Sequence, residues 1–459
     1  MSPLWTSEGI ADATGGTVRG SFEANGVAFD SREITGGDLF VAMKGELTDG
    51  HRFLDKAFAA GAAGALASEE IPQPHVRVAD TTEALNALGR ASRARSKARI
   101  CGVTGSVGKT GTKEALYAAL ARSAPGRAHR SVKSYNNHTG VPLSLARMPR
   151  EARYGVFEMG MNHSGELAAL TRLVRPHVAI VTAIAPAHRE FFASEEEIAD
   201  AKGEIFQGLE KGGTALVPFD SPHRDRLMDA ADPYAGEILT FGLGEGADIW
   251  AREVVSSPGG GTLVSAVLPG AELTYTISQP GEHWVSNSLA VLGAVEAMGG
   301  DVAAAGLALA DMPGLKGRGE RHTVPADGGE AVLIDESYNA NPASMRATLK
   351  TLAEQNVPGR RIAVLGSMRE LGAGSDEFHA ALAEPIERAR VDYAILVGEE
   401  MGALAKALGQ KVKMTHVPDA ASAIDPLREA VRPGDAILVK GSNSIGLAAL
   451  VEAMAGGKS

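Results

Sequence analysis

The sequence contains a single cysteine, Cys101, among its 459 residues. One cysteine permits neither an internal disulfide framework nor a cysteine-rich zinc site, so the fold must depend on its core. Aromatic residues are also scarce, at 5%, whereas glycine occurs 55 times. We therefore expect glycine-built turns and cores made of Ala, Leu and Val. The length is about three times that of a typical domain, which predicts two or three domains.

The chain also lacks a surplus of cations and a long apolar run. Its 45 Lys and Arg against 56 Asp and Glu give a formal net charge of −11. This balance disfavours a nucleic-acid partner, although a few amides and cations can still hold an anionic small molecule. No run approaches the roughly 18 apolar residues of a membrane span, and the first residues lack the pattern of a signal peptide. We therefore expect a cytoplasmic protein without a membrane span.

Three blocks of the sequence differ in pattern. The first, 1–97, contains short strand-like runs and ends in a predicted helix, 82–97, whose basic end we interpret as a solvated helix end feeding a linker. The other two, 98–312 and 313–459, alternate short apolar runs with helical patterns, which is typical of parallel sheets in α/β proteins. Alternation between 248 and 277 indicates a small antiparallel appendage. We expect an α/β protein whose last block is a second, smaller Rossmann-like unit.

The strongest local signal is a phosphate loop. A strand-like run, 99–103, precedes it and a helical pattern, 110–121, follows it, which is the context that such a loop needs. The loop fits the G-x-x-G-K-T form, with glycines that let the backbone fold round an anion and a lysine that can reach the β- and γ-phosphates. Its residues are Gly105, Ser106, Val107, Gly108, Lys109 and Thr110. We predict ATP binding; the alternative is a glycine-rich turn without chemical consequence.

Further motifs occur in a fixed order along the chain. They are Phe29-Asp-Ser-Arg, Gly45-Glu-Leu-Thr-Asp-Gly-His-Arg-Phe, Ser134-Tyr-Asn-Asn-His-Thr-Gly, Phe157-Glu-Met-Gly-Met-Asn-His, Ala201-Lys-Gly-Glu, Lys316-Gly-Arg-Gly-Glu-Arg, Ile334-Asp-Glu-Ser-Tyr-Asn-Ala-Asn-Pro and Leu438-Val-Lys-Gly-Ser. In order and spacing they resemble the Mur ligase family, cytosolic enzymes that build the peptidoglycan precursor. The resemblance implies a UDP-sugar-binding domain at 1–97, an ATP-binding phosphate-loop domain at 98–312 and a C-terminal ligase domain at 313–459.

The resemblance also implies a centre with two Mg²⁺ ions. Glu158 ends an apolar strand, where a carboxylate is costly without a cation, and it would bind one ion beside Thr110. His188 and Lys202 would serve the second ion, the lysine as a carbamate. Taken alone, the histidine is typical of a satisfied core or loop residue and the lysine of a surface residue. Asn137 would lie near the γ-phosphate or acyl group; a turn-forming asparagine is the alternative.

Five later residues resemble the nucleotide contacts of the family. Asn287 would lie at the adenine and Arg318 at the domain junction. Asp335 ends a strand, where doubly wound sheets bind ligands, and would lie at the ribose. Tyr338 or Asn339 would lie near the base. For Arg318 and Asp335 the alternative is a structural ion pair or a helix cap.

The remaining candidates concern the substrate. Ser31 and Arg32 would hold the uridine diphosphate, unless they are a turn residue and a surface arginine. Asp49 and His51 would shape the same N-terminal loop. Lys440 would reach the reacting carboxylate.

Within the family, the runs 338–342 and 368–372 point to the activity that adds D-alanyl-D-alanine to UDP-N-acetylmuramoyl-tripeptide through an acyl phosphate, in a monomer. Three residues depart from the pattern: Gly111, which replaces a hydroxyl residue, and Ser367 and Asn443, where Asp and Arg are usual. Two alternatives stay open. One is a sibling amide ligase with another amino donor, and the other is a nucleotide switch that ligates nothing, for which no Asn-Lys-x-Asp motif is found.

Overall fold

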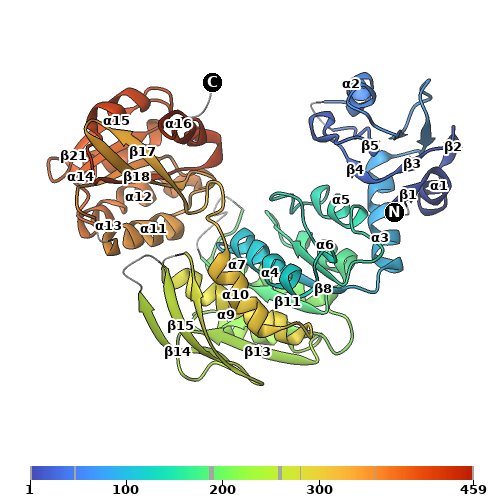
Figure 1. The fold of residues 1–459 in the computed structure, drawn as a ribbon, viewed down its shortest axis with the longest axis horizontal. Coiled ribbons are helices and arrows are strands. Elements are labelled where there is room, and N and C mark those ends of the chain that lie inside the picture. Colours follow the sequence, from blue (N-terminus) through green and yellow to red (C-terminus); the bar gives the residue numbers. More distant parts are fainter. Residues whose placement is uncertain are drawn as a thin grey trace.

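The computed structural model describes residues 3–45, 48–185, 191–256, 261–279, 281–355 and 357–456. Three large sheets, of five, nine and six strands, follow one another along the chain, and the N-terminal and C-terminal parts stand on either side above the central part (Figure 1). The predicted α/β class is confirmed. Within the described residues, no helix is both long and apolar enough to cross a membrane.

The N-terminal part holds a five-stranded sheet in the order β2-β7-β6-β5-β4 and a small β1-β3 pair. Strands β4 to β7 run parallel, and β2 is antiparallel to β7. The strands are β1 (Trp5–Thr6), β2 (Thr17–Arg19), β3 (Glu23–Ala24), β4 (Gly26–Ala28), β5 (Asp38–Val41), β6 (Gly64–Ala67) and β7 (His75–Arg77). The helices are α1 (Ser7–Thr14), α2 (Leu54–Ala59) and α3 (Thr81–Arg95), with 3-10 turns η1 (Ser31–Glu33) and η2 (Gly50–Phe53).

Helix α3 corresponds to the helix predicted over 82–97. Asp80 caps its first turn by accepting hydrogen bonds from the amides of Thr82 and Glu83, which explains why the helix begins there. Its basic end is not simply solvated. Arg93 is buried and donates to the carbonyls of Val174 and Arg175, so the end of α3 is fastened to the central part.

The central part holds a nine-stranded sheet in the order β16-β15-β14-β13-β12-β11-β8-β10-β9. The strands are β8 (Arg99–Thr104), β9 (Ala128–Arg130), β10 (Tyr154–Glu158), β11 (Val178–Val181), β12 (Thr214–Pro218), β13 (Glu237–Gly242), β14 (Ile249–Ser256), β15 (Thr262–Val267) and β16 (Glu272–Ile277). All pairs from β9 to β14 are parallel, whereas β14, β15 and β16 pair antiparallel, which confirms the predicted appendage. The helices are α4 (Lys109–Ser123), α5 (Gly140–Ala146), α6 (Glu166–Val174), α7 (Glu195–Gly203), α8 (Arg224–Ala231), α9 (Glu282–Ala297) and α10 (Val302–Asp311).

The C-terminal part holds a six-stranded sheet in the order β17-β18-β22-β19-β20-β21, parallel except for the β17-β18 pair. The strands are β17 (Glu320–Ala326), β18 (Gly329–Glu336), β19 (Arg361–Gly366), β20 (Tyr393–Val397), β21 (Lys413–Val417) and β22 (Ala436–Lys440). The helices are α11 (Pro342–Glu354), α12 (Ser375–Ala380), α13 (Ala383–Arg388), α14 (Gly402–Leu408), α15 (Ile424–Ala430) and α16 (Leu447–Met454). This parallel, helix-flanked sheet agrees with the predicted Rossmann-like unit.

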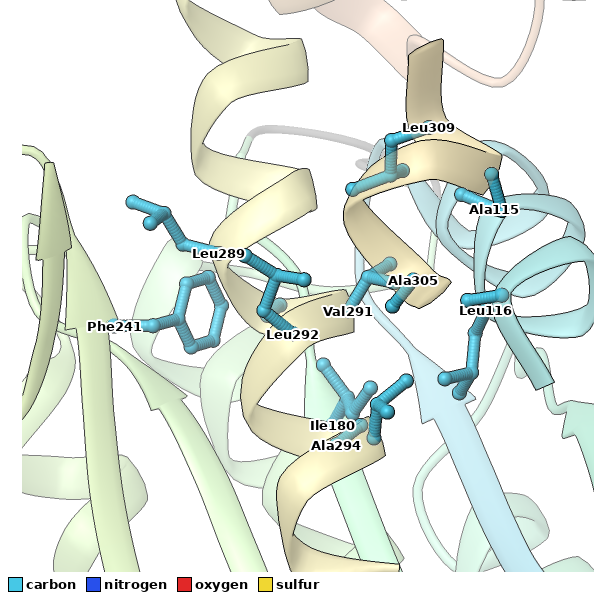
Figure 2. Close-up of a cluster of buried hydrophobic side chains, with 14 of the residues drawn as sticks. Ala115, Leu116, Ile180, Phe241, Leu289, Val291, Leu292, Ala294, Ala305 and Leu309 are labelled. Carbon is cyan, nitrogen blue, oxygen red and sulfur yellow. The ribbon is translucent and has the colours of Figure 1, made fainter. Parts of the chain in front are cut away.

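Helix α9 is the centre of the main core. Figure 2 shows Leu289 and Leu292 beside Phe241 of the sheet, while Val291 lies toward Ala305 of α10. Because α9 is apolar on nearly all sides, it is buried between the sheet and helices α4 and α10. The residues that α9 carries are therefore fixed in place relative to the loop before α4.

Candidate active site

The phosphate loop joins β8 to α4 as predicted. Gly105 and Gly108 have φ values of 148° and 86°, which favour glycine. A Cβ atom at Gly105 would lie 2.0 Å from Oγ1 of Thr182, so no larger residue fits there. The Lys109 ammonium donates to the Gly105 carbonyl at 2.6 Å, and burial lowers its pKa. The Lys109 side chain thus folds back onto the phosphate loop and is held there by the loop backbone.

Helix α9 closes the other side of this loop. A Cβ atom at Gly108 would lie 3.0 Å from Oδ1 of Asn287, which brings the predicted adenine residue against the loop. A Cβ atom at Gly111 would lie 3.0 Å from the ring of Trp284. The indole therefore accounts for the glycine that stands where a hydroxyl residue was expected.

Glu158 lies at the carboxyl end of β10 and is only 1% exposed. Its Oε2 atom accepts a hydrogen bond from the Thr110 hydroxyl at 2.9 Å, and its Oε1 atom accepts one from Nδ2 of Asn136 at 2.8 Å. A buried carboxylate is costly unless such donors satisfy it. The structure thus brings together the hydroxyl and the carboxylate that the sequence assigned to one metal ion.

Lys202 is fully buried near the end of α7. Its Nζ atom has no hydrogen-bond partner among the described residues. Burial, with the positive charge of Lys109 as a second cause, lowers the pKa of Lys202 well below its ordinary value. Burial therefore favours the uncharged amine, and the side chain is not the surface ammonium that its sequence context alone suggests. His188 lies outside the described residues.

One cavity of about 850 Å³ connects these groups with the C-terminal sheet. The central part contributes the phosphate loop, Asn136, Glu158, Lys202 and Asn287 to its wall. The C-terminal part contributes Arg318, Tyr338, Asn339, Arg369, Lys440, Ser442 and Asn443. Most of the candidates for nucleotide and metal therefore share one space, and Lys440 faces it from the opposite side.

On the C-terminal side, Asp335 braces a turn and does not line the cavity. Its carboxylate accepts hydrogen bonds from the amides of Gly317 and Ser337 at 2.9 and 3.0 Å. The same turn places the Arg318 guanidinium 4.2 Å from the centre of the Tyr338 ring. Asp335 thus holds the backbone that presents Arg318.

Lys440 lies at the end of β22 and is buried. Its ammonium donates to the Asn339 carbonyl at 2.9 Å and lies 3.5 Å from the Glu336 carboxylate. Burial lowers the pKa of Lys440, whereas Glu336 opposes this effect. A cation held in this way can meet a carboxylate that enters the cavity.

The two neighbouring asparagines have different places. Asn137 is exposed, and its Oδ1 atom accepts from the amide of Gly140 at 2.9 Å at the start of α5. Asn136 lines the cavity and contacts Glu158. Sequence reasoning missed Asn136; the signal was the Asn-Asn pair before a helix, of which only one member was needed at the turn.

The N-terminal candidates lie apart from this cavity. Arg32, next to Ser31 in η1, is exposed and pairs with Asp30 at 2.6 Å. Asp49 caps η2 and accepts from Nδ1 of His51 at 2.6 Å, while Nε2 of His51 accepts from the Ser68 amide at 3.0 Å. Asp49 and His51 therefore shape their loop, as the sequence analysis expected.

The two C-terminal departures lie close together. Ser367 is buried and donates to Oε2 of Glu400 at 2.8 Å. The guanidinium of Arg369 pairs with the same carboxylate, and both Arg369 and Asn443 line the cavity. A guanidinium thus lines this edge of the cavity with a carboxylate as its partner, although residues 367 and 443 carry neither group.

Three sequence families match the chain. They are the Mur ligase family, catalytic domain, at 23–94, the Mur ligase middle domain at 103–295, and the Mur ligase, glutamate ligase domain, at 317–443. The chain is 33% identical to the UDP-N-acetylmuramoyl-tripeptide–D-alanyl-D-alanine ligase of Bacillus subtilis, over 97% of each chain. It is 34% identical to the enzyme of the same name from Escherichia coli, again over 97% of each.

Solved structures give the same result. The chain is similar to MurF from Acinetobacter baumannii, with a TM-score of 0.85 and 30% identity over 98% of this chain and 99% of that one. It is also similar to MurF from Thermotoga maritima in complex with ADP, with a TM-score of 0.78 and 27% identity over 94% and 97% of the two chains. The family resemblance seen in the sequence is confirmed, and the chain belongs to the Mur ligase family.

Proposed function

We propose that this protein is an ATP-dependent amide ligase that joins D-alanyl-D-alanine to UDP-N-acetylmuramoyl-tripeptide through an acyl phosphate. The observation that carries the proposal is that one cavity is lined both by a phosphate loop and by Lys440 and Arg369 of the C-terminal part. A site suited to phosphoryl transfer thereby faces cations suited to carboxylates. The names of the relatives support this reaction.

We assign one ligand to each part of the chain. Residues 1–97 would bind the sugar nucleotide, with Ser31 and Arg32 at its diphosphate. Residues 98–312 would bind ATP and 313–459 the dipeptide, so the joints lie near 97 and 312. For ATP, the loop amides, the start of α4 and Lys109 would surround the phosphates. Asn287, Arg318, Tyr338 and Asn339 surround the adjoining space, and the ADP complex of the Thermotoga maritima relative supports this use.

The oxygen atoms around the loop fit Mg²⁺. The Thr110 hydroxyl and the Glu158 carboxylate, 2.9 Å apart at the cavity wall, are the type of ligand that this ion prefers. Bound there, Mg²⁺ would neutralise charge on the phosphate oxygens. For a second ion the candidates are His188 and Lys202. A neutral, buried amine is the form that adds CO₂, and the resulting carbamate would offer oxygen atoms in place of a cation.

The reaction requires two displacements. A carboxylate oxygen of the tripeptide attacks the γ-phosphorus while the bond to the β-γ bridging oxygen breaks, and ADP leaves. Lys109 stabilises the negative charge of the transferred group, and Lys440 orients the attacking carboxylate. The neutral amine of the dipeptide then attacks the acyl carbon, the bond to the phosphate oxygen breaks, and the amide nitrogen loses a proton. Inorganic phosphate leaves.

We further propose, as the sequence led us to expect, that the protein is a monomer and that it acts in the cytoplasm. The proposed substrates, ATP and a nucleotide-linked sugar peptide, occur in the cytoplasm, which supports that location.

Phosphate release measured with each UDP-muramoyl peptide, with and without D-alanyl-D-alanine, tests the proposal. We expect release that requires both the tripeptide form and the dipeptide, and a product heavier by the dipeptide residue. Activity with a different amino donor would support the sibling ligase instead. Hydrolysis that is independent of any UDP-sugar would support a nucleotide switch.

A further inference from the structure

Lys113 is a buried cation that the proposed reaction does not use. It lies one helical turn after Lys109 on α4, and its side chain is fully buried. A buried ammonium is costly unless carboxylates and carbonyls surround it. The groups that surround the Lys113 ammonium therefore indicate its role.

The ammonium of Lys113 lies 3.6 Å from Oε2 of Glu158, the same oxygen atom that accepts the Thr110 hydroxyl. Residues 110 and 113 are neighbours on one face of the helix, so α4 directs a hydroxyl and a cation at one carboxylate oxygen. The ammonium also lies 3.1 Å from Glu114, but that carboxylate has its own cation in Arg130, at 2.8 Å. The charge of Lys113 is thus available to Glu158.

The same ammonium donates to the carbonyl of Lys133. Lys133 has a φ of 48°, a left-handed conformation that costs a residue with a side chain about 1 kcal/mol or more. This conformation begins the segment that delivers Asn136 to Oε1 of Glu158. Lys113 therefore acts on both oxygen atoms of Glu158, on one directly and on the other through the backbone of the 133–136 segment.

The segment is also tied to the N-terminal part. The Lys133 ammonium and the Tyr135 hydroxyl both contact the Glu33 carboxylate in η1, the latter at 2.6 Å. Lys113 thus contacts a segment that joins η1 to the Glu158 site.

We propose that Lys113 is a positioning residue that orients the Glu158 carboxylate for Mg²⁺ by holding both Glu158 and the Lys133 carbonyl. This inference rests on the proposed function only in taking Glu158 as a magnesium ligand. It requires no peptide substrate and no dipeptide.

The test is Mg²⁺-dependent binding of ADP, measured by calorimetry without peptide or dipeptide. In Lys113→Met we expect the Mg²⁺ concentration that half-maximally tightens ADP binding to rise about 10-fold or more. ADP binding without Mg²⁺ should stay within about 2-fold. Lys113→Gln, which can still donate to the Lys133 carbonyl but carries no charge, should show the same direction of change. Arg122→Met is the matched control, because Arg122 lies on the same helix as Lys113, α4, and forms an exposed ion pair with Asp311 of α10.

A double variant separates positioning from a general loss of stability. Adding Lys113→Met to Glu158→Gln should change the Mg²⁺ dependence no further, because both act through one carboxylate. An unchanged Mg²⁺ dependence in the single variants would overturn the proposal, as would failure of both to fold, which would assign Lys113 to core stability. Loss of ligation with normal Mg²⁺ and ADP binding would count against the proposed function and leave this inference intact.

Discussion

The Thr110 hydroxyl and the Glu158 carboxylate share a 2.9 Å hydrogen bond although 48 positions separate them in the sequence. Strand β10 pairs in parallel with β8, with Glu158 opposite Val103. The carboxylate therefore reaches the carboxyl edge of the sheet beside the phosphate loop, which is where open α/β sheets bind ligands. A strand register, rather than a local motif, creates this pair.

Glu158→Gln tests the pair. The amide keeps the size of the side chain but removes the charge. We therefore expect kcat to fall about 100-fold and the Mg²⁺ concentration needed for half-maximal activity to rise. Steady-state phosphate release across a Mg²⁺ titration measures both. Glu272→Gln, at an exposed ion pair with Arg252, is the control and should behave as wild type. Wild-type Mg²⁺ dependence in Glu158→Gln would remove Glu158 from the metal site.

The adjacent asparagines should separate catalysis from stability. Asn136→Ala removes a donor to Glu158, so we expect a kcat about 10-fold or more lower with little change in stability. Asn137→Ala removes the acceptor of the Gly140 amide at the start of α5 and should reduce the free energy of unfolding by about 1 kcal/mol while kcat stays near wild type. Steady-state kinetics measure kcat of both variants, and urea denaturation measures their free energy of unfolding. The reverse result would restore Asn137 as the residue at the γ-phosphate.

Lys202→Arg should abolish activity, because a guanidinium neither loses its proton nor adds CO₂ at neutral pH. The wild-type protein kept in bicarbonate should carry the added mass of one CO₂ in native mass spectrometry, and the variant should not. ADP binding without Mg²⁺ should persist in the variant, which shows that it is folded. An active Lys202→Arg enzyme would contradict the carbamate assignment.

Arg369→Gln should raise the KM for D-alanyl-D-alanine about 10-fold, since a hydrogen bond between charged groups contributes about 1.5–3 kcal/mol. The KM for ATP should change little, because Arg369 lies at the C-terminal edge of the cavity. Initial rates over a dipeptide titration give the result. Arg388→Gln, at an exposed pair with Glu384, is the control. A shifted ATP KM with a normal dipeptide KM would place Arg369 at the nucleotide instead.

Stability should fall as the pH falls from 6.5 toward 4, in part because of His177. Its Nδ1 atom accepts from the Ile100 amide at 3.0 Å, and burial lowers its pKa from 6.5 to about 4. In that range the unfolded chain binds a proton that the folded state does not, so the free energy of unfolding rises with pH. His177→Asn keeps an acceptor without the titration and should flatten this slope in urea denaturation, whereas His138→Asn, at an exposed histidine, should not. Equal slopes in wild type and His177→Asn would contradict this reasoning.

The sequence was sufficient for features that are local or periodic. The phosphate loop is six consecutive residues between a strand and a helix, so its fold and orientation follow from its neighbours. The alternating strands before Ile277 predicted the antiparallel appendage for the same reason. Strand β17, in contrast, escaped notice, because its residues, ERHTVPA, do not alternate in hydrophobicity, although their burial in the fold does alternate.

Long-range burial could not be predicted. Lys113 and Lys202 have the sequence context of surface lysines, and only the packing of other segments over them buries their ammonium groups. The two backbone amides that Asp335 satisfies, one from a turn 18 residues earlier and one from its own neighbour, could not be foreseen either, and its place at a ribose stays a prediction. Such partners depend on chain geometry, which composition and spacing do not encode.

The contact between Gly111 and Trp284 limits how this sequence can evolve. A side chain at position 111 would begin 3.0 Å from the indole, which is itself buried in the core around α9. A serine or threonine at 111 therefore requires the indole to move by a few tenths of an ångström, and a smaller residue at 284 would remove that requirement. We expect the two positions to covary among descendants of this chain, because this one contact links the sizes of their side chains.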